Sequence, residues 1–260
     1  GMGVWFSTFL ALVGHRVDAV DPAWAGIAAA PGRFPELAAV GDLDAYDFIL
    51  VSVPLASTPL AVAEVVEHRP RGVVVEIASI KSHLLPALDA ADRLGVRVAC
   101  LHPMFGPGKS PYEPLTFVLA CRRPAEEETA ALAPLLLHPY SSLVPIPFPH
   151  HDRLMGWLLG LAHLTGMLFG VALAHAGLDA AELQRCASTT FERQAATAVS
   201  VVSEDPDLYL DIQRLNPHRQ EVYRAVQEAL ADLVGAVERG DREAFAASLG
   251  AARRFLTETG

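Results

Sequence analysis

The sequence carries little charge and few cysteines, and both shortages exclude classes of protein. Charged residues are 19% of the 260 residues and hydrophobic ones 52%, so the chain folds and is not disordered. Its net charge of -10, with no cluster of lysine or arginine, argues against a nucleic-acid partner. Cys100, Cys121 and Cys186 are odd in number and lack metal-ligand spacing. We therefore expect a reducing compartment and no metal site.

No targeting signal is visible, and one apolar segment needs an explanation. The N-terminus lacks a basic region followed by an apolar run and a cleavage site, so we expect a cytoplasmic protein. Residues 154–174 are long and apolar enough to span a bilayer. The segment lies mid-chain without a basic flank or a second span, which favours a helix buried in a helical core or dimer interface. A membrane protein is the alternative.

The first part of the chain alternates strands with helices. Short apolar runs at 48–53, 73–77 and 96–101 are typical of buried strands, and helical patterns at 58–68 and 84–94 separate them. Two further strands are expected at 116–120 and 143–146, with a helix at 126–136 between them. This order predicts a mostly parallel, Rossmann-like sheet with right-handed crossovers.

Beyond residue 149 only helical periodicity is found. The expected helices cover residues 153–176, 179–203, 206–236 and 241–258. The sequence therefore predicts an α/β domain over residues 1–149 and an all-helical domain over residues 150–260.

The N-terminal stretch has the order of the second half of a dinucleotide-binding unit. Gly3 precedes a helix expected at 4–13, and a strand expected at 17–21 ends in Asp21. An acid in this position accepts hydrogen bonds from the adenosine ribose and favours NAD over NADP. The simpler interpretation of Asp21 is a turn aspartate before Pro22.

Three strand ends bring polar groups to the carboxyl edge of the predicted sheet, where open α/β sheets bind ligands. The first strand ends at Ser52, Val53 and Pro54, and the second is followed by Ser79 and Lys81. These positions predict contacts with the cofactor or the substrate. An ordinary strand end is the alternative for each.

The third strand delivers His102, held by Pro103 ahead of a loop with Gly106, Pro107 and Gly108. The ordinary pKa of histidine, near 6.5, lets it accept a proton around neutral pH. We therefore interpret His102 as a general base, against the alternative of an incidental loop histidine.

Four motifs then resemble the prephenate dehydrogenase family of tyrosine biosynthesis: "ASIKSHL", "HPMFGP", "HHDRLMGWLLGLAH" and "SEDPDLYLDIQRLN". They occur in the family's order and cover essentially the whole chain. The resemblance implies an NAD-binding domain joined to a helical domain that forms a homodimer. It also implies an oxidative decarboxylation, in which the ring hydroxyl of prephenate loses its proton, hydride passes to NAD+ and CO2 leaves.

The resemblance also assigns roles to single residues. His102 matches the catalytic histidine, and Ser79 matches a serine that contacts the same hydroxyl and orients that histidine. His163 matches a histidine of the substrate pocket, with a core histidine as the alternative, and Tyr209 is the aromatic residue of the "DPDLY" motif. The pair His151-Asp152 matches a motif at the domain junction, interpreted as structural.

One departure concerns the substrate. Family members carry an arginine nine residues before the aromatic residue of that motif, where this chain has Ser200. A serine cannot give the bidentate contact that a guanidinium gives to a carboxylate. Arg193 on the same helix, or Arg214 or Arg219 beyond it, are the candidate replacements. The substrate is accordingly prephenate or an analogue, arogenate or 4-amino-4-deoxyprephenate.

Two other classes compete with this interpretation. The β-hydroxyacid dehydrogenases also join a Rossmann domain to helices, but they rely on a lysine in the helical domain, and no lysine follows Lys109. A degenerate relative that binds a ligand without turnover is the non-enzymatic alternative. Ser200 and the absence of the family's N-terminal glycine turn favour it, whereas Ser79 and His102 oppose it.

The second departure generates a prediction about cofactor affinity. Family members begin with a strand and a glycine-rich turn that ends at the position of Gly3, and neither precedes Gly3 here. Because that turn cradles the pyrophosphate at the helix N-terminus, we expect weak NAD+ binding, or a sheet edge completed by a neighbouring chain. Calorimetric titration measures the affinity, and a micromolar dissociation constant would contradict weak binding.

Overall fold

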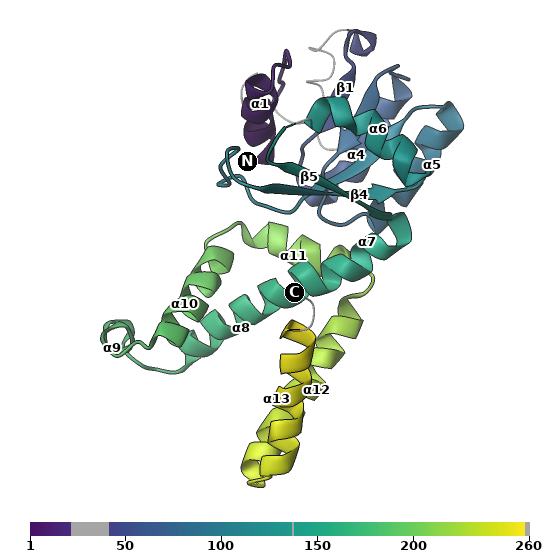
Figure 1. The fold of residues 1–260 in the computed structure, drawn as a ribbon. Coiled ribbons are helices and arrows are strands. Elements are labelled where there is room, and N and C mark those ends of the chain that lie inside the picture. The colour runs from purple at the N-terminus through teal and green to yellow at the C-terminus, as the bar shows by residue number, and fades with distance from the viewer. Residues whose placement is uncertain (22–41, 137, 258–260) are drawn as a thin grey trace. The chain divides into compact units, whose positions relative to one another are not determined.

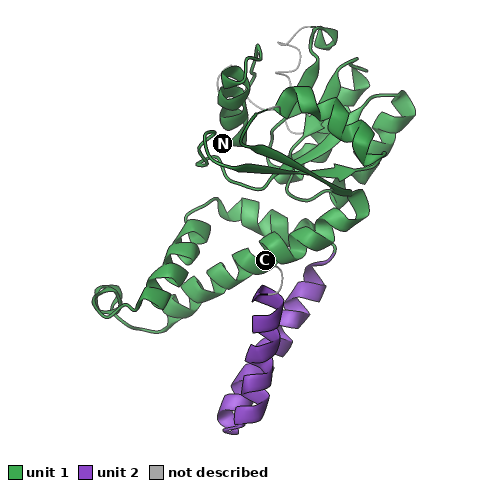
Figure 2. Ribbon diagram, in the orientation of Figure 1, with its two compact units in different colours: residues 1–217 green, residues 218–260 purple. Residues whose placement is uncertain are grey.

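The computed structural model describes residues 1–21, 42–136 and 138–257, and it divides into two compact units, residues 1–217 and 218–260 (Figure 2). The first unit holds the sheet and most of the helices. The second is a helical hairpin of α12 (Arg219–Glu238) and α13 (Arg242–Thr257). Gly240, between them, has a φ of +64°, which suits a glycine in a tight turn.

The described part of the first unit contains a five-stranded sheet with the order β1-β2-β3-β4-β5 (Figure 1). Its strands are β1 (Phe48–Val51), β2 (Val73–Glu76), β3 (Val98–Pro103), β4 (Leu115–Cys121) and β5 (Ser141–Pro147). The pairs β1/β2, β2/β3 and β4/β5 are parallel, and β3/β4 is antiparallel. The predicted mostly parallel, Rossmann-like fold is confirmed.

Helices cover both faces of this sheet. One face packs against α1 (Met2–Leu12) and α6 (Ala125–Leu136), and the other against α4 (Thr58–Glu67) and α5 (Leu85–Leu94). Alternation within β2 explains the two cores, because Val73 and Val75 face the first layer and Val74 the second. Short 3-10 turns precede or connect these elements at η1 (Leu43–Ala45), η2 (Leu55–Ser57) and η3 (Ser82–Leu84).

The strand expected at residues 17–21 is not formed, so that prediction is wrong. Residues 15–21 are irregular, and β1 is the edge strand of the described sheet. A strand is stable only when a neighbour pairs with its backbone groups, and the described residues offer none here. The segment 22–41, which follows Asp21, lies outside the described residues.

From Phe148 onward the described chain is helical. The helices of the first unit are α7 (Phe148–Met155), the π-helical segment η4 (Gly156–Leu161), α8 (Ala162–His175), α9 (Ala180–Arg185), α10 (Thr189–Val202) and α11 (Pro206–Leu215). The single helix expected at 206–236 is broken at Asn216-Pro217, since proline disfavours a helical conformation at the residue before it. The last strand ends at Pro147, close to the expected boundary at 149, whereas the compact units divide at 217. The two-domain division stays a prediction.

The stretch Phe148–His175 is, by length and composition, one helix that could cross a membrane. Little of its most apolar part is buried, so the expectation of a helix buried in a helical core does not hold within the described chain. Gly166 lets α10 pack closely, because a Cβ there would lie 3.1 Å from Val201 Cγ2. Large apolar side chains of both helices, among them Leu168 and Val199, are nevertheless exposed.

Candidate active site

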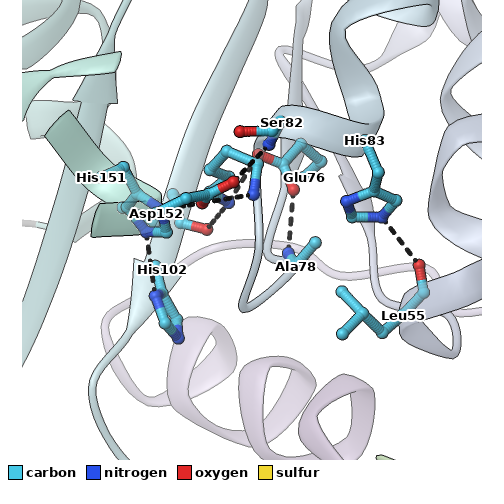
Figure 3. Close-up of polar contacts among 10 residues, drawn as sticks. Leu55, Glu76, Ala78, Ser82, His83, His102, His151 and Asp152 are labelled. Carbon is cyan, nitrogen blue, oxygen red and sulfur yellow. Dashed lines mark hydrogen bonds and ion pairs between the residues drawn. The ribbon is translucent and has the colours of Figure 1, made fainter. Parts of the chain in front are cut away.

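A chain of hydrogen bonds joins His102 to the first helix after the sheet. His102 lies near the end of β3 and is 3% exposed, and its Nδ1 is 3.1 Å from Nε2 of His151 in α7. Nδ1 of His151 is in turn 2.7 Å from Oδ1 of Asp152. Figure 3 shows the three side chains in this order. Residues 49 positions apart in the sequence thus form one polar unit.

The carboxylate at one end of this chain sets the proton positions along it. An ionised Asp152 can only accept, so Nδ1 of His151 carries the hydrogen and, in a neutral ring, Nε2 is an acceptor. Nδ1 of His102 must then donate to that acceptor, which leaves Nε2 of His102 with a free lone pair. Nε2 makes no hydrogen bond to the described residues. The site therefore presents a neutral imidazole with its basic nitrogen available to a ligand.

The pKa values agree with this assignment. Burial, together with the neighbouring His151 and Lys81, holds the pKa of His102 well below its usual range. Burial also lowers the pKa of His151, although its hydrogen bond to Asp152 opposes the change. Both rings are therefore neutral around pH 7.

Asp152 stays ionised in spite of its burial. Burial alone would raise its pKa, but hydrogen bonds from His151, Ser82 and Lys81 lower the value to about 2. The backbone N–H groups of Lys81 and Ser82 lie 2.8 Å and 2.7 Å from its two oxygens. These donors belong to the turn after β2, so that turn fixes the carboxylate to the sheet.

Lys81, a predicted cofactor contact, points into the protein. It is 0% exposed, and its Nζ donates to Glu76 Oε1 at 2.6 Å and to the carbonyl oxygen of Leu101 at 2.8 Å. A buried ammonium has no surface with which to touch a cofactor. The ammonium of Lys81 therefore bonds groups inside the protein, and the prediction that it contacts the cofactor is not supported by its position.

Ser79 is half-buried beside this turn. The described residues show no hydrogen bond between Ser79 and His102, whose Nδ1 is instead bonded to His151. The orienting partner of the predicted base is thus His151, for which the sequence predicts only a structural role. The expected contact of Ser79 with a substrate hydroxyl stays a prediction.

Two of the four predicted substrate residues lie together. His163 in α8 and Tyr209 in α11 pack edge to face, with ring centroids 4.5 Å apart and planes at 85°. Burial lowers the pKa of His163, and its Nδ1 is buried without a hydrogen-bond partner among the described residues. A buried, unpaired ring nitrogen costs free energy unless a ligand satisfies it. This observation supports a pocket role for His163.

The other two predicted substrate residues, Arg193 and Ser200, are exposed on α10. Ser200 Oγ donates to the carbonyl oxygen of Thr197 at 2.8 Å, within its own helix. Of the candidate replacements for the family's arginine, Arg214 bonds Asp211 at 2.7 Å. Arg193 and Ser200 therefore have no observed link to the pair of His163 and Tyr209.

Two of the remaining cofactor candidates, Gly3 and Ser52, lie close together where α1 begins beside the end of β1. A Cβ on Gly3 would lie 3.4 Å from Ser52 Oγ, so the start of α1 approaches the strand end closely. Ser52 and Val53 are half-buried there, while Pro54 and Asp21 are exposed. Dinucleotide-binding folds hold their phosphates where a helix begins beside a strand end, so the contacts of these residues with the cofactor stay a prediction. No group of three potential metal ligands is found among the described residues.

The fold is that of a Rossmann-like dehydrogenase followed by a helical region, and the histidine chain lies where the sheet meets the first of these helices. Residues 148–251 match the family described as "Prephenate dehydrogenase, dimerization domain". The whole chain is 31% identical to the 4-amino-4-deoxyprephenate dehydrogenase of Streptomyces pristinaespiralis, and covers 89% of it. The chain belongs to the prephenate dehydrogenase family, as its motifs indicate.

Other relatives differ in how much of them the chain spans. It is 28% identical, over 76% of its own length, to the "Probable arogenate/prephenate dehydrogenase" of Methanocaldococcus jannaschii, but spans only 45% of that protein. The prephenate dehydrogenase of Aquifex aeolicus, solved with hydroxyphenyl propionate and NAD+, has the same fold, with a TM-score of 0.73. That likeness covers all of this chain and 95% of the other at 16% identity.

The depressed pKa of Asp152 gives a prediction about acid stability. Because the folded-state value of about 2 lies below the ordinary 3.8, the ionised group stabilises the fold above pH 3.8, and this contribution disappears as the pH falls toward 2. Asp152→Asn should therefore lower the free energy of unfolding near neutral pH by about 2 kcal/mol or more. Urea unfolding at about pH 6 and about pH 3 should show this deficit shrinking in acid.

Asp232→Asn is the matched control, because Asp232 is exposed on α12. It should change stability little at either pH. A deficit for Asp152→Asn that is equal at both pH values would contradict an ionised, hydrogen-bonded carboxylate.

Proposed function

We propose that the chain catalyses the NAD+-dependent oxidative decarboxylation of prephenate to 4-hydroxyphenylpyruvate, with His102 as the base. The observation that carries the proposal is the hydrogen-bond chain from Asp152 through His151, which leaves Nε2 of His102 as a free acceptor. Family membership supplies the reaction class.

In the proposed reaction a single histidine, His102, both accepts the proton and returns it. Nε2 of His102 takes the proton of the ring 4-hydroxyl while C4 loses hydride, so that a ring carbonyl forms. The bond from C1 to its carboxylate then breaks, CO2 leaves, and the electron pair makes the ring aromatic with negative charge on the ring oxygen. His102 returns its proton to that oxygen. Bound NAD+ supplies the hydride acceptor.

The chain's own residues would hold the two ligands as follows. Gly3, Ser52, Val53 and Pro54 would contact the cofactor, with Asp21 on the adenosine ribose. His163 and Tyr209 would contact the substrate ring.

A second candidate substrate is 4-amino-4-deoxyprephenate, in which the ring carries nitrogen in place of the hydroxyl. Two observations favour it. The chain lacks the family's arginine, and the Streptomyces pristinaespiralis relative is similar over the whole length. The same base would then take a proton from nitrogen. Arogenate, which differs from prephenate in its side chain, is the third substrate for the test.

The proposal predicts turnover that depends on His102. NADH absorbance, followed with NAD+ and each of the three substrates, should rise with one of them. His102→Asn keeps a donor toward His151 but has no base, so we expect kcat to fall about 10²- to 10⁴-fold with substrate affinity retained. His150→Asn, at the exposed neighbour of His151, is the control and should keep full activity. Unchanged turnover in His102→Asn would remove the base role, and silence with all three substrates would point to a non-catalytic relative.

We further propose a cytoplasmic homodimer, formed through the helical region, that needs no membrane. In support, large apolar side chains are exposed along α7 to α8 and on α10, namely Leu154, Trp157, Leu158, Leu168, Val171, Val199 and Val202. An exposed apolar surface of this extent is typical of an interface.

Light scattering should give about twice the 27.8 kDa of one chain, in the soluble fraction without detergent. Leu168→Glu should shift the mass toward the monomer, because a charge at an apolar interface is costly. Leu60→Glu is the control, since Leu60 is 45% exposed on α4 and Leu168 is 50% exposed. A monomeric unaltered protein, or one extracted only by detergent, would overturn the proposal.

A further inference from the structure

The end of β2 carries a buried ion pair that the proposed reaction does not use. Glu76, the last residue of β2, and Lys81 are both 0% exposed, with Oε1 and Nζ 2.6 Å apart. The other carboxylate oxygen of Glu76 accepts from the backbone N–H of Ala78 at 2.8 Å. Lysine and glutamate are almost never fully buried unless paired, because the loss of hydration is costly. Replacement of a buried ion pair by apolar residues of similar volume is often neutral or stabilising, so stability alone does not explain these residues.

Lys81 is bonded to Asp152, at one end of the histidine chain, and to the residue next to His102, at the other. Its Nζ donates to the carbonyl oxygen of Leu101, the residue that precedes His102 in β3, at 2.8 Å. Its backbone N–H donates to Asp152 Oδ1 at 2.8 Å, the oxygen that also accepts from His151. One residue is therefore bonded to the strand that carries the base and to the carboxylate that orients its partner.

We propose that Lys81, held by Glu76, is a positioning residue that fixes the separation of His102 and His151. This inference rests on the proposed function, in which His102 is the base. Glu76 fixes Nζ, Nζ fixes the backbone at Leu101, and the turn around Lys81 fixes Asp152. The two imidazoles meet at 3.1 Å, near the upper end of hydrogen-bond distances. A displacement of about 1 Å in either element would break that bond, and misplacement of this size can cost about 10²-fold in rate.

The charges around His102 give the same residue an electrostatic effect. Lys81 and Glu76 lie at the end of β2, His151 and Asp152 in α7, and Cys100 on the strand of His102 itself. After burial and His151, the charge of Lys81 lowers the pKa of His102, and Asp152 raises it. Loss of the Lys81 charge should therefore move the pKa of His102 upward.

The test replaces both members of the ion pair, since removal of one leaves an unpaired buried charge and can unfold the protein. In Lys81→Met/Glu76→Gln the amide oxygen can still accept from Ala78. We expect kcat to fall about 10- to 100-fold while the KM for NAD+ is unchanged. The acid limb of kcat/KM should move to higher pH, because the base is protonated more readily. A raised KM for NAD+ at unchanged kcat would instead show that Lys81 serves the cofactor.

Lys109→Met is the matched control, because Lys81 and Lys109 are the only lysines of the chain. Lys109 pairs with Glu113 at the surface, and its loss should leave the acid limb in place. A folded double variant with unchanged kcat and acid limb would overturn the positioning role while the proposed function stands.

A readout without turnover separates the two proposals further. NMR titration of the imidazoles, with His102 assigned by comparison with His102→Asn, gives the pKa of His102 directly. We expect that pKa to be higher in the double variant than in the unaltered protein. An upward shift in a protein that is silent with all three substrates would support the arrangement around Lys81 and reject the proposed reaction. An unchanged pKa would reject the electrostatic effect of Lys81 on His102, and an unchanged kcat in the same folded variant would reject its positioning role.

Discussion

The buried carboxylate of Asp152 is the group on which the geometry of the site depends. Its two oxygens accept from two backbone N–H groups of the turn after β2 and from His151. Its backbone carbonyl oxygen accepts from Asn216 Nδ2 at 2.7 Å, at the end of α11. The turn, α7 and α11 are thereby joined at one residue. A fully satisfied carboxylate in a low-dielectric interior rigidifies what it bonds, and an unsatisfied one would be costly.

This arrangement suits a base that must release its proton again. A histidine whose pKa is depressed is unprotonated at neutral pH, so it is ready to accept. On the proposed function the ring oxygen both loses and regains a proton within one turnover, and a weakly held proton is returned easily. The carboxylate of Asp152 favours the transient positive charge on His102, while burial, His151 and Lys81 oppose it. The pKa of His102 is set by the balance between these neighbours.

The sequence predicts the parts of the fold that depend on local patterns. It does not predict those that depend on contacts between residues distant in the sequence. Buried parallel strands such as 73–77 are recognisable as short apolar runs between helices. The strand expected at 17–21 has the right composition, but a strand depends on a neighbour that no local pattern supplies. The contact of His151 with His102 cannot be predicted for the same reason, since only the folded chain brings the two residues together. For Lys81 the sequence does carry a signal of the buried ion pair, because Glu76 lies only five residues earlier at the end of the preceding strand.

At the position of the family's arginine this chain has Ser200, which leaves the binding of a substrate carboxylate to other residues. Ser200 carries no charge, and the ammonium of Lys81 is committed inside the protein. Arg193 is exposed on α10 with no observed contact to His163 or Tyr209. His163 is a weak substitute because burial lowers its pKa and favours the neutral ring. The aromatic pair of His163 and Tyr209, by contrast, provides an apolar surface and one unsatisfied ring nitrogen for a substrate ring. On the proposed function, recognition of the ring and removal of its proton follow the family pattern. The contact with a substrate carboxylate, for which the family uses an arginine, is the part of recognition in which this chain differs.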